Sequence, residues 1–281
     1  MYCVDVRPKN FNHSAYLSSY FPELVKPFMR DLSFPHILPK IISFNNSKNL
    51  KMNIAILGTG SVGQALAEKL ISVGHIVIMG TRNVEDTMAR KPSGNQDGPS
   101  FSDWVLKNHN IVLKTFKEAV YEGELIINAL AGGVTLATLQ SCEQEDFDHK
   151  VIMDISNPLD FSKGFPPTLL SGLNNTYSLG EAIQKELPNA KVVKTLNTMW
   201  SGLMVNPKMI ADGHHQNFIC GNDNDAKAKV IDILTSFGWE RDYILDLGDI
   251  TNARGTEAIL LLWIRIYGAT QSGAFNFKIV K

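Results

Sequence analysis

The sequence predicts an α/β fold, a doubly wound parallel sheet followed by a short C-terminal helical segment. From residue 53 onward, short apolar runs alternate with segments of helical periodicity, a pattern typical of parallel strands joined by right-handed crossovers. The apolar runs are continuous rather than alternating, as expected of strands that are covered on both faces. A glycine-rich turn, residues 58–63, separates the first of these runs from the first helical segment.

The elements are expected in the following order. The first strand is Asn53–Leu57, the first helix is Ser61–Val73, and the second strand is His75–Met79. Residues 91–100 have the composition of a loop. Later strands are expected at Ile111–Leu113, Leu125–Ala129, Val151–Ile155, Lys191–Leu196 and Asn217–Cys220, with helices at Ser178–Leu187, Asp223–Phe237 and Gly255–Ala269.

Three regions are predicted along the chain. Residues 1–51 carry seven basic and three acidic residues without sustained periodicity. They are interpreted as a poorly ordered extension, either a gene-model artefact upstream of a start at Met52 or a genuine appendage. Residues 52–222 form the predicted nucleotide-binding domain. Residues 223–281 form a segment for substrate binding and dimerisation, because the last helix is apolar around most of its circumference.

Composition excludes several classes of protein. The 281 residues include 27 basic and 28 acidic ones, a net charge of −1, so nucleic acid is not an expected partner. No apolar run approaches the roughly 18 residues that span a bilayer, and no membrane association is expected. The three cysteines are too scattered for a disulfide framework or a metal site. These features favour a cytoplasmic protein.

The glycine-rich turn matches the G-x-G-x-x-G fingerprint of dinucleotide-binding Rossmann domains. Its residues are Gly58, Thr59, Gly60, Ser61, Val62 and Gly63. The motif follows a strand and opens a helix, which is the context that the fingerprint requires. Gly58 is expected to make the tight turn, Gly60 to admit a pyrophosphate, and Gly63 to let the helix pack closely.

The end of the second strand favours NADP over NAD. NAD sites place an acid there to bind the ribose hydroxyls, but this chain has Thr81, Arg82 and Asn83, with no acid before Glu85. A guanidinium flanked by hydroxyl and amide donors suits a 2′-phosphate.

These motifs resemble those of the NADP oxidoreductases that depend on coenzyme F420, a deazaflavin. The similar stretches are Asn53–Gly63, Gly80–Arg82, Asp154–Leu159, Lys194–Thr198, Cys220–Ala226 and Asp246–Ile250. The resemblance covers residues 52–281. It implies direct hydride transfer between the nicotinamide and a deazaflavin or flavin ring.

The resemblance also implies site residues. Thr59, Thr81 and Arg82 would hold the 2′-phosphate. The nicotinamide would be lined by two strand ends, Ala129-Leu130-Ala131 and Asn157-Pro158. Gly248 and Ile250 would lie near the acceptor ring.

Catalytic residues are harder to assign from the sequence. Ring-to-ring hydride transfer needs only proximity, orientation and exclusion of water. Lys194 is the one candidate proton donor for an imine or keto-acid reductase related to pyrroline-5-carboxylate reductases, and it could equally be a solvated or salt-bridged lysine at a strand edge. Thr198 follows a strand end and is expected in the substrate cleft. A third possibility is an NADPH-binding sensor without turnover. A homodimer is favoured.

Overall fold

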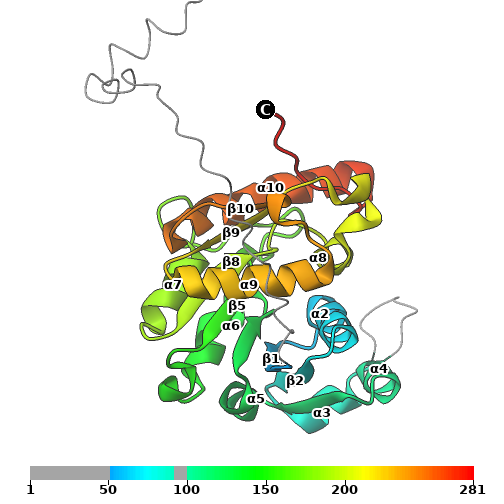
Figure 1. Ribbon diagram of the computed structural model, residues 1–281. Helices are drawn as coiled ribbons and strands as arrows, with labels where there is room; N and C mark the ends of the chain where they lie inside the picture. Colours follow the sequence, from blue (N-terminus) through cyan, green and yellow to red (C-terminus); the bar gives the residue numbers. More distant parts are fainter. Residues whose placement is uncertain (1–50, 92–99) are drawn as a thin grey trace, which may run out of the picture. The chain divides into compact units, whose positions relative to one another are not determined.

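The computed structural model describes residues 51–91 and 100–281 (Figure 1). The predicted extension over residues 1–51 and the predicted loop over 91–100 lie almost entirely outside these residues. Within the described ranges, eight strands form one sheet in the order β10-β9-β8-β5-β4-β1-β2-β3. In chain order they are β1 (Asn53–Leu57), β2 (Ile76–Thr81), β3 (Ile111–Thr115), β4 (Leu125–Asn128), β5 (Val151–Asp154), β8 (Lys191–Thr195), β9 (Asn217–Gly221) and β10 (Ile244–Asp246).

The helices connect these strands and cover the sheet (Figure 1). They are α2 (Ser61–Ser72), α3 (Val84–Ala89), α4 (Phe101–Lys107), α5 (Phe116–Glu122), α6 (Gly132–Gln140), α7 (Leu179–Glu186), α8 (Ser201–Val205), α9 (Asn224–Phe237) and α10 (Ala253–Thr270). Short 3₁₀ turns are η1 (Gln144–Phe147), η2 (Pro207–Met209), η3 (Ala211–Gly213), η4 (Arg241–Tyr243) and η5 (Ile250–Asn252). A small hairpin joins β6 (Leu159–Asp160) to β7 (Thr168–Leu169).

The predicted fold class is confirmed. The strands β3-β2-β1-β4-β5-β8 are all parallel to their neighbours, in the strand order of a doubly wound dinucleotide-binding domain. All the predicted strands and helices are present in the structure, with ends shifted by one or two residues. The second strand runs on to Thr81, so this residue ends the strand rather than following it.

Two strands depart from the expected parallel sheet. β9 pairs antiparallel with β8, and β10 is parallel to β9, so both run against the other six. The physical reason lies in the connection over residues 196–216. It is long enough for a crossover, but it contains only the five-residue helix α8 and the turns η2 and η3 instead of the long helix that usually carries the chain back for a parallel pairing. β10 belongs to this sheet although it follows residue 222, and α9 packs against the sheet.

The core has two halves because side chains alternate along each strand. Ile54 and Ile56 of β1 pack with residues of α2, α8 and α9 on one face. Ala55 and Leu57 pack with residues of α5 and α7 on the other face. Burial on both faces explains why the strand sequences are continuously apolar.

Helix α10 is buried less completely than the sequence predicts. In the single chain one side of it is buried, including Leu260 and Ile264, whereas Leu262 and Tyr267 are exposed. Its apolar character around most of its circumference is therefore not explained by packing within one chain. In the described part of the chain, no helix is both long and apolar enough to cross a bilayer.

Candidate functional site

Two glycines shape the turn between β1 and α2. Gly58 has a φ of +118°, and a Cβ there would lie 2.8 Å from the carbonyl oxygen of Ala129. A Cβ at Gly63 would lie 2.2 Å from the carbonyl oxygen of Gly58. The first turn of α2 is thus packed directly against the loop. Among the described residues, a Cβ at Gly60 would meet no atom within 4 Å, so the helix N-terminus is open for an anion.

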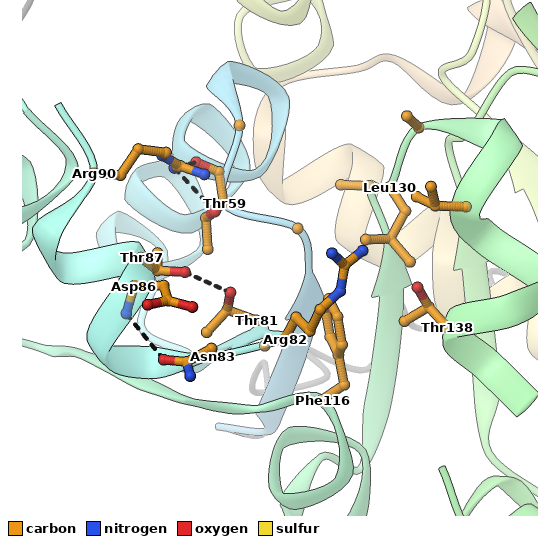
Figure 2. A pocket seen from close by; sticks show the side chains of 16 residues that line it. Thr59, Thr81, Arg82, Asn83, Asp86, Thr87, Arg90, Phe116, Leu130 and Thr138 are labelled. Carbon is orange, nitrogen blue, oxygen red and sulfur yellow. Dashed lines mark hydrogen bonds between the residues drawn. The ribbon is translucent and has the colours of Figure 1, made fainter. Parts of the chain in front are cut away.

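This turn forms one wall of a cavity of about 450 Å³. Its mouth lies at the carboxyl ends of β1, β2 and β4, where ligands bind in doubly wound sheets. The predicted cofactor residues that line it are Gly58, Thr59, Gly60, Thr81, Arg82, Asn83, Ala129, Leu130 and Ala131. The cavity is also lined by residues that were not predicted as cofactor residues from the sequence: Gly80, Asp86, Thr87, Arg90, Phe116, Val134 and Thr138. Figure 2 shows the labelled side chains around the cavity.

Other predicted cofactor residues do not line this cavity. Ser61, Val62 and Gly63 form the first turn of α2. Asn157 and Pro158 pack against the start of α6 instead, because a Cβ at Gly132 would lie 2.2 Å from the carbonyl oxygen of Asn157. Their assignment to the nicotinamide remains a prediction.

Polar side chains at the end of β2 and in the segment after it line one side of the cavity. We call Thr81, Arg82, Asn83 and Thr87 the polar wall. The hydroxyls of Thr81 and Thr87 are 2.6 Å apart. Asn83 caps α3, with its side-chain oxygen accepting a hydrogen bond from the backbone nitrogen of Asp86 at 2.9 Å. The Arg82 side chain is exposed and lines the cavity, where it points toward Leu130 in Figure 2.

Arg90 brings a second guanidinium to the cavity. Its Nη2 donates to the carbonyl oxygen of Thr59 at 3.3 Å and to the Thr59 hydroxyl at 3.1 Å. Its guanidinium carbon lies 5.5 Å from the centroid of the Phe101 ring, within the range of a cation–π contact. Sequence analysis missed Arg90 because it stands eight residues beyond Arg82, outside the motif, and only the folding of α3 brings it back to the glycine-rich turn.

Buried polar residues fix the strand ends beyond the cavity. Asp154 Oδ1 accepts hydrogen bonds from Asn128 Nδ2 at 2.8 Å and from the Ser156 hydroxyl at 2.6 Å. The side chains of Asn157 and Asn197 are also paired, since Asn197 Nδ2 donates to Asn157 Oδ1 at 2.9 Å. The ends of β4, β5 and β8 are therefore held in one hydrogen-bonded row.

Lys194 is completely buried at the centre of this row. Its Nζ lies 2.8 Å from Asp154 Oδ2, 2.8 Å from Glu257 Oε1 and 2.6 Å from the Ser156 carbonyl oxygen. Burial lowers the pKa of Lys194, but the charges of Asp154 and Glu257 outweigh it and the net direction is upward. The lysine is salt-bridged, as one interpretation held, but it is neither solvated nor at a sheet edge. Because all three ammonium protons face protein oxygens, the geometry leaves none for a substrate.

Glu257 links this lysine to two helices. Its carboxylate also accepts hydrogen bonds from the backbone nitrogens of Leu179 and Gly180, at 2.8 and 3.0 Å. These are the first two residues of α7, where the helix dipole favours an anion. We call Asp154, Lys194 and Glu257 the buried triad.

The predicted substrate residues are dispersed. Thr198 lies beyond the carboxyl end of β8 and is buried, and its hydroxyl has no hydrogen-bond partner among the described residues. Gly248 is bonded to Gly221, with its carbonyl oxygen 2.9 Å from the Gly221 nitrogen. Since β9 and β10 run against the other strands, Gly248 is carried away from their carboxyl ends. Ile250 is buried in the second half of the core. Neither Gly248 nor Ile250 lines the cavity.

Comparisons with protein families and curated proteins give consistent results. Residues 53–158 match the family of coenzyme F420-dependent NADP oxidoreductases. An F420-dependent NADP reductase of Methanocaldococcus jannaschii is 29% identical over 218 residues, which are 76% of this chain and 91% of that protein. Metalloreductase STEAP3 of Rattus norvegicus is 27% identical over 74% of this chain. The chain spans only 36% of the length of this metalloreductase.

Solved structures extend the comparison. A proposed F420-dependent NADP-reductase from Arthrobacter sp. FB24 is 46% identical, with a TM-score of 0.76. The match covers 82% of this chain and all of that one. A reductive aminase from Aspergillus terreus in complex with NADPH has a TM-score of 0.52 at 15% identity, over 79% of this chain and 63% of that one. At that identity the likeness concerns the fold alone.

Proposed function

The chain belongs to the family of coenzyme F420-dependent NADP oxidoreductases, and we propose that it transfers a hydride between NADP(H) and a flavin or F420-like deazaflavin. The observation that carries the NADP assignment is the polar wall of the cavity. It presents Thr81 and Arg82 at the end of β2, the place where an NAD site has an acid. The bound nucleotide would supply the hydride, while Gly60 and the N-terminus of α2 would hold its pyrophosphate.

The type of hydride acceptor is proposed because no proton donor for a substrate has been found among the described residues of the site. Reduction of an imine or a ketone needs a proton donor at the substrate, and the candidate Lys194 is enclosed by oxygens of the buried triad and of Ser156. Transfer between two stacked rings needs no such donor, only orientation and exclusion of water. The hydrogen-bonded row of strand ends at β4, β5 and β8 would provide that orientation.

Anaerobic NADPH oxidation tests the proposal directly. The purified protein is offered coenzyme F420, FMN, FAD and a ferric chelate in parallel, and the absorbance of NADPH is followed. Rapid turnover with coenzyme F420 or a flavin is expected. If NADPH binds but no acceptor is reduced, the proposal is wrong and a sensor becomes the better interpretation. Turnover with an imine or keto acid would favour a small-molecule reductase instead.

Arg82→Asp is expected to change the nucleotide preference. The substitution removes a charge-assisted phosphate contact and adds repulsion, so affinity for NADPH should fall by about tenfold to a hundredfold. Affinity for NADH should change by less than about threefold. Fluorescence titration with each nucleotide measures both values. Equal losses for NADPH and NADH would contradict the assignment of Arg82 to the 2′-phosphate.

Two further features belong to the proposal. A homodimer would cover the exposed residues Leu262 and Tyr267 of α10. A cytoplasmic location agrees with free thiols at Cys142 and Cys220, and with the use of NADPH.

A further inference from the structure

The charges that line the cavity do not suit a phosphate unless Arg90 takes part. The charged side chains of its lining are Arg82, Asp86 and Arg90. If Arg82 acted alone, the carboxylate of Asp86 would cancel its charge. A nucleotide 2′-phosphate carries a charge of about −1.5 to −2 near neutral pH. Among the described residues, the lining is net positive only with both guanidiniums.

The two arginines lie on different sides of the cavity. In Figure 2, Arg90 lies with Thr59 on one side, whereas the Arg82 side chain points toward Leu130. Phe116 and Leu130 line the cavity together with Arg82, so the cavity also offers an apolar surface to a flat base, on which a guanidinium stacks well. Arg90 instead donates to Thr59, and the hydroxyls and amide of Thr81, Thr87 and Asn83 line the same cavity, so a phosphate on this side would meet several hydrogen-bonding groups.

Arg90 is also held in place before any ligand binds. Its two hydrogen bonds to Thr59 both use Nη2, and the ring of Phe101 supports the guanidinium. An arginine has five N–H donors, so donors remain for a ligand. Because the side chain is already restrained, binding a phosphate costs less conformational entropy than it would for a free arginine.

We propose that Arg90 is a second arginine ligand of the 2′-phosphate and, with Arg82, determines the preference for NADPH over NADH. This inference rests on the proposed function and adds a specificity-determining residue to the site. Arg82 then covers the adenine as well as facing the phosphate. Arg90 supplies the charge that outweighs Asp86.

The experiment compares Arg90→Ala with a matched control, Lys91→Ala. Lys91 is the exposed neighbour of Arg90 and does not line the cavity. The control therefore removes one positive charge near the site and leaves the lining side chains unchanged. Calorimetric titration uses 2′,5′-ADP, which carries the 2′-phosphate, and 5′-AMP, which lacks it. We expect Arg90→Ala to weaken 2′,5′-ADP binding by about tenfold to a hundredfold and 5′-AMP binding by less than threefold. Lys91→Ala should change both by less than threefold.

A double-mutant cycle separates a direct contact from an effect through Thr59. If Arg90 contacts the phosphate, Arg90→Ala should weaken 2′,5′-ADP binding in a Thr59→Val background as well. If Arg90 only orients Thr59, its substitution should have no further effect there, and the proposal is overturned. Thermal unfolding of each variant confirms that the fold is intact.

The outcomes also distinguish this inference from the proposed function. If Arg82→Asp weakens NADPH binding but Arg90→Ala leaves 2′,5′-ADP binding unchanged, the NADP assignment stands and the role of Arg90 is wrong. If the wild-type protein binds 2′,5′-ADP and 5′-AMP equally, the NADP assignment fails as well.

Discussion

Lys194→Met is expected to lower the free energy of unfolding by about 3–5 kcal/mol, since removing one partner of a buried ionic group leaves uncompensated charge. The change would leave Asp154 and Glu257 facing each other in a region where both are almost fully buried. Glu257 would keep its hydrogen bonds to the start of α7, and Asp154 would keep those to Asn128 and Ser156, but the positive charge between them would be gone. Urea unfolding followed by circular dichroism measures the loss.

A matched control is available on the same strand. Lys191 forms an ion pair with Asp223 at 3.0 Å, but both side chains are about one-third exposed, so Lys191→Met should cost less than about 1 kcal/mol. A second variant, Lys194→Met with Glu257→Gln, should recover part of the stability by removing one of the two unpaired charges. Equal costs for the two single variants would show that the buried triad contributes no more than a surface ion pair.

The pH dependence of this effect has a definite sign. The pKa of Lys194 lies above its ordinary value of 10.5 in the folded protein. A group of this kind contributes its full stabilisation below the unfolded pKa and loses it as the pH rises through the folded pKa. The contribution of Lys194 should therefore be constant through neutral pH, and the difference between wild type and Lys194→Met should shrink only in strongly alkaline solution.

Gly63→Ala is expected to lower both stability and nucleotide affinity. The new Cβ would lie 2.2 Å from the Gly58 carbonyl oxygen, so the backbone of the turn or of α2 has to move. Overpacking of this kind costs about 3 kcal/mol. Because the same backbone would present its amides to the pyrophosphate, NADPH affinity should fall by about a hundredfold, the equivalent of about 2.7 kcal/mol.

Gly60→Ala provides the matched comparison. Its Cβ meets no described atom within 4 Å, so the free energy of unfolding should stay within about 0.5 kcal/mol of the wild-type value. NADPH binding should still weaken at least tenfold, because the methyl group would stand where the pyrophosphate approaches. If Gly60→Ala bound NADPH like the wild type, the pyrophosphate would not lie at this turn.

The sequence is most informative where a local pattern is sufficient. β1 and α2 follow from an apolar run, a glycine fingerprint and helical periodicity. The helices α4 and α5 were not predicted, although each begins with a capping box, Ser100 with Asp103 and Thr115 with Glu118. This pattern of a hydroxyl three residues before an acid is visible in the sequence and could have located both helices.

Other features depend on contacts between distant segments. The direction of β9 is set by the path of its connection, which the apolar pattern of the strand does not encode. Arg90 reaches Thr59 across 31 residues, and Lys194 meets Glu257 only when α10 has docked. A lysine within an apolar run gives no indication of whether it will be solvated, paired or buried. These parts of the site could not be predicted from one sequence.

The buried triad also has a consequence for the order in which the chain can mature on the ribosome. Asp154 and Lys194 emerge well before Glu257, which belongs to α10, the last helix of the described residues. Until then the first two amides of α7 lack the carboxylate that accepts their hydrogen bonds, and Lys194 lacks one of its two counter-ions. The central strands can pair during translation, but their charged centre is completed only after release of the C-terminal helix.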